Sequence, residues 1–200
     1  MNLPPVILAS ASPRRAELLR EVVTDFQILA GQTDEFQPEQ FSPIESCLLN
    51  AYRKARVIAK RFPDALVLGA DTEVCLGRRV FGKPSDRLDA ERMMEELEGR
   101  THQVITGVCL IHLRHHHQRA FAEVTRVTFK HLGADEIIDY LDRINPLDKA
   151  GAYAIQEHGE MILDKMEGSF SNVVGLPVER LREELERFSA EEQRRRDAQG

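Results

Sequence analysis

Arg14 and Arg15 form a pair of cations directly after a serine-containing segment near the start of the chain. Ser12 can cap a helix whose first position is Pro13, which places both arginines in the first helical turn. The helix dipole is positive there and disfavours each cation by about 0.3–1 kcal/mol. Free backbone N–H groups, the hydroxyls of Ser10 and Ser12 and two guanidinium groups suit a phosphate, which would supply the missing negative charge. The alternative is that both arginines turn to solvent or to carboxylates elsewhere.

Asp71 is the second residue with a chemical role to offer, because it directly follows the apolar run of residues 65–70. If that run is a buried strand, Asp71 lies at its carboxyl end, where open α/β sheets place their ligands. Such a carboxylate can hold Mg²⁺ or accept a proton from an attacking water. An aspartate that only opens a turn is the alternative, and for a lone aspartate it is the more common role.

Residues 77–84, Gly-Arg-Arg-Val-Phe-Gly-Lys-Pro, nearly match a P-loop. Pro84 stands where that motif requires a hydroxyl for Mg²⁺, and the segment resembles a hairpin return, so a P-loop is rejected. Lys83 can still act as a point charge for phosphate, with an exposed lysine as the alternative. Lys54 and Glu35 would complete a set of several cations and two carboxylates, which suits a polyphosphate with a bridging divalent metal.

Other polar clusters carry weaker signals. The run His115-His116-His117 lies in a polar connection without cysteine or carboxylate partners at ligand spacing, so we expect a solvated loop. The charged segment 191–196 is expected to be a frayed helix end. Three widely spaced cysteines indicate reduced, buried thiols of a cytoplasmic protein: Cys47, Cys75 and Cys109. HExxH, GxSxG and GxGxxG motifs do not occur.

The composition of the chain limits the kinds of partner that it can bind. The chain has 200 residues, 42% of them hydrophobic and 30% charged, which is typical of a globular protein. Its 27 Lys+Arg against 33 Asp+Glu give a net charge of −6, which argues against a broad nucleic-acid surface but not against a small phosphate ligand. No apolar run approaches the ~20 residues that span a bilayer, so no membrane contact is expected.

The elements that must position these residues form one α/β domain with a mixed sheet. Residues 1–5 and 189–200 are expected to be flexible ends. Apolar runs and caps predict strands at 6–9, 65–70, 102–113, 121–129 and 161–163, a hairpin return at 80–81, and helices after Ser12, Ser42 and Ser85, over 134–144 and from Val178. The helix after Ser42 carries the apolar stripe Ile44, Leu48, Ala51, Ala55, Ile58 and Phe62, which puts Lys54 beside its buried face.

Five blocks in register extend the interpretation: LASASPRR at 8–15, GADT at 69–72, GKP at 82–84, DKAGAY at 148–153 and NVVGLP at 172–177. In these blocks, over residues 6 to 188, the sequence resembles the Maf family of nucleoside triphosphate pyrophosphatases, which is also associated with septum formation. The resemblance implies an elongated Maf/ITPase-like fold, a mixed sheet flanked by helices, with two lobes and a central cleft. It further implies metal-dependent (Mg²⁺ or Mn²⁺) hydrolysis of a nucleoside triphosphate to a monophosphate and pyrophosphate.

The resemblance also assigns roles residue by residue. Asp71 matches the proton acceptor and, with Glu35, the metal position. Ser10, Arg15, Lys54 and Lys83 match polar positions around the phosphates. Arg14, Thr72 and Gln156 match the branch that prefers dTTP and UTP, and a Gln amide is complementary to the N3–H and carbonyl edge of thymine or uracil.

Two segments depart from that branch. Residues 157–160, Glu-His-Gly-Glu, replace its small, glycine-rich residues, and Phe170-Ser171-Asn172 also differs. A nucleotide-binding regulator of cell division with incidental hydrolysis stays open as the alternative function, as does a sugar-nucleotide transferase. A homodimer is one open alternative for the oligomeric state.

Overall fold

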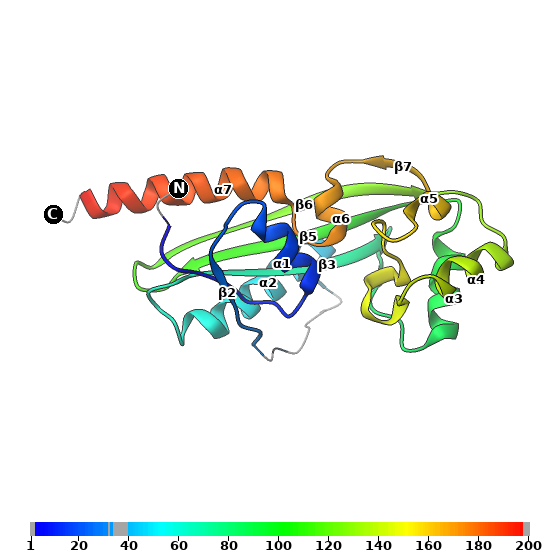
Figure 1. Cartoon of the computed structure of the whole chain (residues 1–200), viewed down its shortest axis with the longest axis horizontal. Helices are drawn as coiled ribbons and strands as arrows, with labels where there is room; N and C mark the ends of the chain where they lie inside the picture. Colours follow the sequence, from blue (N-terminus) through cyan, green and yellow to red (C-terminus); the bar gives the residue numbers. More distant parts are fainter. Residues whose placement is uncertain (1–2, 32, 34–39, 198–200) are drawn as a thin grey trace.

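The computed structural model describes residues 3–31, 33 and 40–197. Within them, seven strands form one mixed sheet in the order β2-β1-β3-β5-β6-β7, with β4 paired to β3 at one end (Figure 1). The strands are β1 Val6–Leu8, β2 Phe26–Ile28, β3 Leu66–Leu76, β4 Arg79–Phe81, β5 Thr101–His112, β6 His117–Phe129 and β7 Leu163–Glu167. The predicted α/β class with a mixed sheet is confirmed.

Helices cover the sheet and its ends. They are α1 Pro13–Arg20, α2 Pro43–Ala59, α3 Arg87–Leu97, α4 Ala134–Asp142, α5 Gly159–Ile162, α6 Phe170–Val174 and α7 Val178–Asp197, with short 3-10 turns η1 Pro146–Asp148 and η2 Ala150–Ala152. In the described part of the chain, no helix is both long and apolar enough to cross a membrane.

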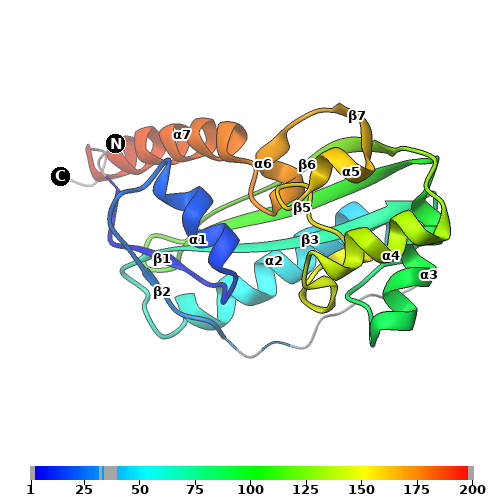
Figure 2. The same cartoon turned by 45° about the vertical axis from the view of Figure 1, so that its right-hand side comes forward.

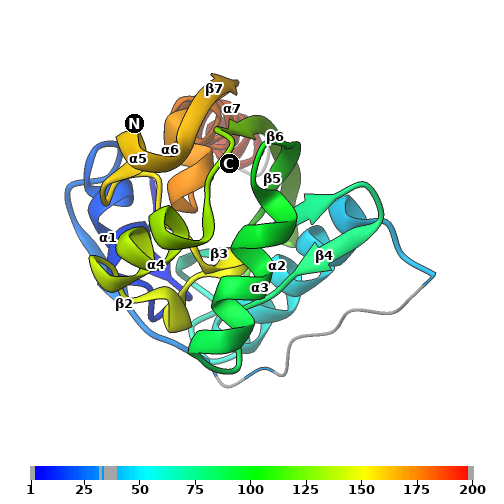
Figure 3. The same ribbon diagram turned by 90° about the vertical axis from the view of Figure 1, so that its right-hand side faces the viewer.

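Long antiparallel strands β3, β5 and β6 form the axis of the elongated molecule, and a lobe lies at each end (Figure 1). One lobe packs α1 and α7 on the sheet through a cluster that includes Leu19, Leu181 and Phe188. The other packs α3 and α4 around Met94 and Tyr140, and it faces the viewer in Figure 3. Each lobe therefore has its own hydrophobic cluster, while the same strands run through both.

Helix α2 lies on the face of the sheet opposite α1 and α7 (Figure 2). Two glycines permit its close approach, because a Cβ at Gly69 would collide with the carbonyl oxygen of Ala51, and a Cβ at Gly107 would lie 2.5 Å from the carbonyl carbon of Cys47. The backbone of α2 therefore sits directly against β3 and β5. This contact fixes how far the α2 side chains reach across the sheet.

Local capping signals are confirmed for the first two helices. Ser12 accepts a hydrogen bond from the Arg15 N–H at 3.4 Å, and Ser42 forms a complete capping box with Glu45. The predicted buried stripe of α2 holds for its centre, at Ala51 and Ala55, but Ile44 in the first turn is 41% exposed. Its end of the helix extends past the sheet.

Several predicted boundaries are wrong. The strand expected to end at residue 70 continues to Leu76, so Asp71 lies inside β3 and not at its carboxyl end. Helix α3 is capped by Asp86, whose Oδ1 accepts from the Asp89 N–H at 2.8 Å, and not by Ser85. Residues 161 and 162 end the short helix α5, and β7 begins only at Leu163.

The histidine run 115–117 and the charged segment 191–196 also differ from the prediction. His117 begins strand β6 and is buried, so the run 115–117 is only partly a loop. Segment 191–196 continues α7, and Glu192 is buried against the turn between β5 and β6, so the expected frayed end is wrong there. The three cysteines are free and buried, as predicted.

Candidate functional site

A cleft opens where strand β3 changes neighbours. On one edge of β3, β1 pairs as far as Leu68 and β4 pairs from Val74 onward, and among the described residues no strand pairs between them on that edge. Asp71 and Thr72, in the segment between these pairings, line a cleft of about 420 Å³ between the lobes. Both faces of the strand can present side chains to this space, because neighbouring residues of a strand alternate in direction.

Asp71 projects from β3 toward α2 and is 5% exposed. Its Oδ1 lies 2.5 Å from Nζ of Lys54, and its Oδ2 accepts a hydrogen bond from Nδ2 of Asn50 at 3.2 Å. Asn50 and Lys54 are one turn apart on α2, so both point to the same part of the sheet. The close packing of α2 on Gly69 brings these two donors to the carboxylate and fixes its orientation.

Thr72, the next residue of β3, projects to the opposite face and meets Arg15. The Arg15 guanidinium donates from Nη2 to Oγ1 of Thr72 at 2.9 Å, from Nη1 to Oγ of Ser10 at 3.3 Å, and from Nε to the carbonyl of Gly175 at 2.9 Å. The fork of donors thus links the first loop, β3 and the end of α6. Arg15 is held in place by three separate segments beside the cleft.

Arg14 reaches across the cleft to the other lobe, where its Nη1 lies 3.0 Å from Oδ2 of Asp148. Burial raises the pKa of Asp148, but hydrogen bonds from Lys149 and Arg14 outweigh it and lower the pKa. Lys149 is buried and donates to Oδ1 of Asp148 at 2.8 Å. The alternative, in which both arginines turn away to solvent or to carboxylates, therefore holds only in part: Arg14 meets a carboxylate, but both arginines line the cleft.

The cleft collects every predicted site residue that the structure describes: Ser10, Arg14, Arg15, Lys54, Asp71, Thr72, Lys83 and Gln156. Lys83 and Gln156 are exposed at its rim, and the Gln156 amide contacts only its neighbour Glu157, at 3.4 Å. The predicted metal residue Glu35 lies outside the described residues.

Four further side chains at or beside the cleft were missed by the sequence analysis: Asn50, Glu73, Asp148 and Lys149. Asn50 could have been found from its spacing of four residues before Lys54 on a predicted helix. Glu73 stands two residues after Asp71, the spacing that puts two strand residues on one face. Asp148 and Lys149 begin the DKAGAY block at 148–153, but that block by itself does not show that Asp148 meets Arg14 of the other lobe.

A divalent cation fits the acid groups at this position. One ligand atom each of Cys47, Asp71 and Glu73 lies within 4.8 Å of the others, and all three residues are buried. Burial, with the charge of Glu73, raises the pKa of the Cys47 thiol, so it stays protonated and is no ligand for a hard cation. The two carboxylates are the oxygen donors that Mg²⁺ or Mn²⁺ requires.

The chain belongs to the Maf-like protein family, whose model matches residues 5–188. This confirms the resemblance seen in the five sequence blocks. Two similar proteins carry names that are more specific than the family description. The dTTP/UTP pyrophosphatase of Acetivibrio thermocellus is 42% identical over 92% of this chain and 94% of its own length. That of Akkermansia muciniphila is 44% identical over 88% of this chain and 92% of its own.

Among solved structures, a HAM1 protein from Coxiella burnetii is similar at 12% identity and a TM-score of 0.45. The match covers 64% of this chain and 73% of that chain.

Proposed function

We propose that this protein is a nucleoside triphosphate pyrophosphatase that hydrolyses the bond between the α and β phosphates of dTTP and UTP. The observation that carries the proposal is the buried Asp71 carboxylate, oriented by Lys54 and Asn50, at the open edge of β3 in a cleft lined by five cationic side chains. Its relatives named dTTP/UTP pyrophosphatase, at 42–44% identity over most of the chain, support the same activity.

Asp71 is proposed to accept the proton of the attacking water. The water oxygen forms a bond to the α-phosphorus, and the bond from that phosphorus to the α–β bridging oxygen breaks. The bridging oxygen leaves with the electron pair as part of pyrophosphate, and a nucleoside monophosphate remains. A carboxylate holds the proton of water only transiently, so its fixed position toward the water is what makes it effective.

Arg15, Lys54 and Lys83 are proposed to bind the phosphates. Negative charge develops on the phosphate oxygens during the displacement, and fixed cations in a partly enclosed cleft stabilise it. Arg15 is already held by Ser10, Thr72 and Gly175, so its orientation requires no reorganisation when substrate arrives. The acidic chain thus binds a polyanion through a few local cations.

Asp71 and Glu35, with Glu73 beside Asp71, are proposed to hold a divalent ion of the Mg²⁺ or Mn²⁺ class. When bound, such an ion neutralises phosphate charge and lowers the pKa of coordinated water. Three buried free thiols support a reducing, cytoplasmic compartment for the enzyme.

Base selection is proposed to depend on Gln156, Thr72 and Arg14. The exposed Gln156 amide offers both a donor and an acceptor to the pairing edge of thymine or uracil. Arg14 holds the lobe that carries Asp148 and Gln156 against the lobe that carries Ser10. A purine edge would meet the wrong donor and acceptor pattern there.

A product assay tests the proposal. The purified chain is incubated with dTTP, UTP, dCTP, dATP and GTP, with Mg²⁺ or Mn²⁺ and with EDTA, and pyrophosphate and orthophosphate are measured separately. We expect pyrophosphate and monophosphate from dTTP and UTP, and none in EDTA. Release of orthophosphate alone would overturn the reaction type, and equal rates with GTP would overturn the base preference.

A further inference from the structure

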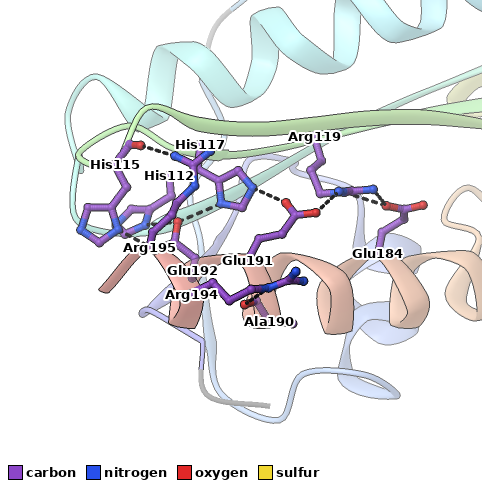
Figure 4. A network of polar contacts seen from close by, with 10 residues as sticks. All are labelled: His112, His115, His117, Arg119, Glu184, Ala190, Glu191, Glu192, Arg194 and Arg195. Carbon is purple, nitrogen blue, oxygen red and sulfur yellow. Dashed lines mark hydrogen bonds and ion pairs between the residues drawn. The ribbon is translucent and has the colours of Figure 1, made fainter. Parts of the chain in front are cut away.

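A second polar cluster lies where the turn between β5 and β6 meets the end of α7, and Figure 4 shows its members. We call it the hairpin–helix cluster. It consists of His112, His115 and His117 from the hairpin and Glu191 and Glu192 from the helix. These two sets of residues are about 75 positions apart in the sequence. The cluster takes no part in the function proposed above.

Glu192 lies at its centre and is 2% exposed. Its Oε1 lies 3.3 Å from Nδ1 of His112 and 2.9 Å from Nδ1 of His117, and its Oε2 lies 2.5 Å from Nδ1 of His115. Burial raises the pKa of Glu192, but hydrogen bonds from the three histidines outweigh it and lower the pKa to about 2. Both carboxylate oxygens of Glu192 therefore lie close to imidazole nitrogens.

Three of these residues have the spacing of a metal ligand set. One ligand atom each of His112, His115 and Glu192 lies within 4.8 Å of the others. The rings of the two histidines approach to 4.3 Å between centroids, with 53° between their planes. In a tetrahedral zinc site with bonds of roughly 2.0–2.2 Å, neighbouring ligand atoms are about 3.3 Å apart. The separation of His112 Nδ1 and Glu192 Oε1 already has this value.

We propose that His112, His115 and Glu192 form a binding site for Zn²⁺, separate from the cleft. Two imidazole nitrogens with one carboxylate form a donor set that suits zinc, whereas magnesium prefers a set made of oxygen atoms alone. His115 is about one-third exposed and lies in the turn, so it can move away from the carboxylate to admit the ion. The exposed side also provides a fourth position, which water fills.

Outer contacts hold these ligands in place, as they do in established zinc sites. His117 contacts Glu192 through Nδ1 and Glu191 through Nε2, at 2.9 and 2.8 Å. Arg119 donates to Glu191 at 2.7 Å and to Glu184 at 2.8 Å, along the same side of α7. Arg195 of α7 donates to the carbonyl of His115, which lies in the turn, at 3.1 Å.

The zinc site shares no residue with the cleft. In the register of β5 with β3, Asp71 pairs with Gly107, and His112 lies five residues further along the strand. At about 3.3 Å per residue, this separation is roughly 17 Å. Bound zinc would cross-link the hairpin to the last helix, so the expected consequence is a more stable fold and not a faster reaction.

The test uses the full, tag-free chain after treatment with a chelator. Zinc binding is measured by titration calorimetry in the presence of excess Mg²⁺, and Co²⁺ replaces Zn²⁺ to give a visible spectrum that distinguishes four-coordinate nitrogen ligation from six-coordinate oxygen ligation. The variants are His115→Ala, which removes a ligand that is about one-third exposed, and Glu192→Gln. The control is His116→Asn, because His116 is exposed in the same turn and its positive φ of 47° suits Asn.

We expect one zinc per chain in the wild-type protein and the control, with a rise in Tm on zinc addition. In His115→Ala, zinc affinity falls by at least ~10-fold, the size typical of a disrupted metal site, and the rise in Tm is lost. Unchanged zinc binding in His115→Ala would overturn the proposal, as would an equal loss in His116→Asn. If Glu192→Gln fails to fold, the His115→Ala comparison alone decides the outcome.

Discussion

Asp71 in the cleft and Glu192 beneath α7 are both buried carboxylates, 5% and 2% exposed, and both lie among nitrogen groups. Their partners differ. Asp71 meets Lys54 and Asn50 from one helix, and the open edge of β3 leaves its other side facing the cleft. Glu192 meets three imidazoles from a hairpin that folds around it.

The difference shows that burial of a charged group does not by itself identify an active site. Every buried carboxylate must be compensated, or it would become protonated. At Asp71 the compensation comes from one side, so a substrate and a metal can approach from the other. At Glu192 it comes from all sides, so the group links two segments of the fold. We expect the first arrangement to support the proposed reaction and the second to stabilise the fold.

The largest effect is expected for Asp71→Asn. The amide cannot accept a proton from water, so kcat with dTTP should fall by about 10³-fold, within the range attributed to general bases. Nucleotide binding should persist, because Arg15, Lys54 and Lys83 remain. Steady-state kinetics and calorimetric binding of dTTP in EDTA measure the two effects separately.

Asp64→Asn is the matched control for this change. Asp64 is an exposed carboxylate paired with Arg114 at 2.8 Å on the surface, far from the cleft residues in the fold. Its substitution should leave kcat unaltered. Turnover that survives in Asp71→Asn would show that Asp71 is not the base. The two carboxylates would then no longer differ in that one of them acts in the reaction.

His102 is a buried imidazole that forms no ion pair with a carboxylate of the described residues, in contrast to the histidines around Glu192. It is 1% exposed, its Nε2 lies 2.9 Å from the Tyr153 hydroxyl, and Phe129 packs on its ring. Burial lowers the pKa of His102 from 6.5 to about 4. The unfolded chain therefore binds one more proton than the folded chain between these pH values.

The stability contributed by neutral His102 is thus complete above pH 6.5 and is lost as the pH falls toward 4, by about 3 kcal/mol in total. Urea unfolding of the wild-type chain and of His102→Gln at several pH values measures it. The variant should lose less stability over this range, whereas His131→Gln, on a side chain that is 91% exposed, should behave as the wild type. Parallel curves for wild type and His102→Gln would contradict the assignment.

Glu192→Gln tests whether the Glu192 carboxylate stabilises the fold. The amide cannot accept hydrogen bonds from three imidazoles, so the free energy of unfolding in EDTA should fall by about 2 kcal/mol. Hydrolysis of dTTP with Mg²⁺ should be unchanged, because the cleft lies in a different part of the sheet from Glu192. A loss of turnover in a folded Glu192→Gln variant would show that the two regions are coupled.

The smallest effect is expected for Gln156→Ala, which changes selectivity and not chemistry. Loss of the amide should lower kcat/KM for dTTP relative to dCTP by roughly 10-fold, the value of one or two hydrogen bonds to a base edge. Competition assays with paired nucleotides measure the ratio. Glu157→Gln is the control at the neighbouring position, and an equal change in that variant would move base selection away from Gln156.

Local signals in the sequence were sufficient for much of the fold. Caps such as Ser12 and Ser42 act on backbone N–H groups only three residues away, so their effect is readable from neighbours in the chain. The alternation along β6, which buries Thr125, Val127 and Phe129, is local in the same sense. The end of β3 was misjudged because Asp71, Thr72 and Glu73 interrupt the apolar run that indicates a buried strand, although the strand continues through them to Leu76.

The apolar runs, the caps and the five family blocks were enough to predict the class of fold and the eight described residues that meet in the cleft. The surroundings of each carboxylate depend on tertiary packing. Asp71 faces the cleft because β1 and β4 leave an edge of β3 uncovered, and Glu192 lies among three imidazoles because α7 packs on a hairpin about 75 residues away. Long-range contacts of this kind depend on how separate elements pack, and no pattern among sequence neighbours records that packing.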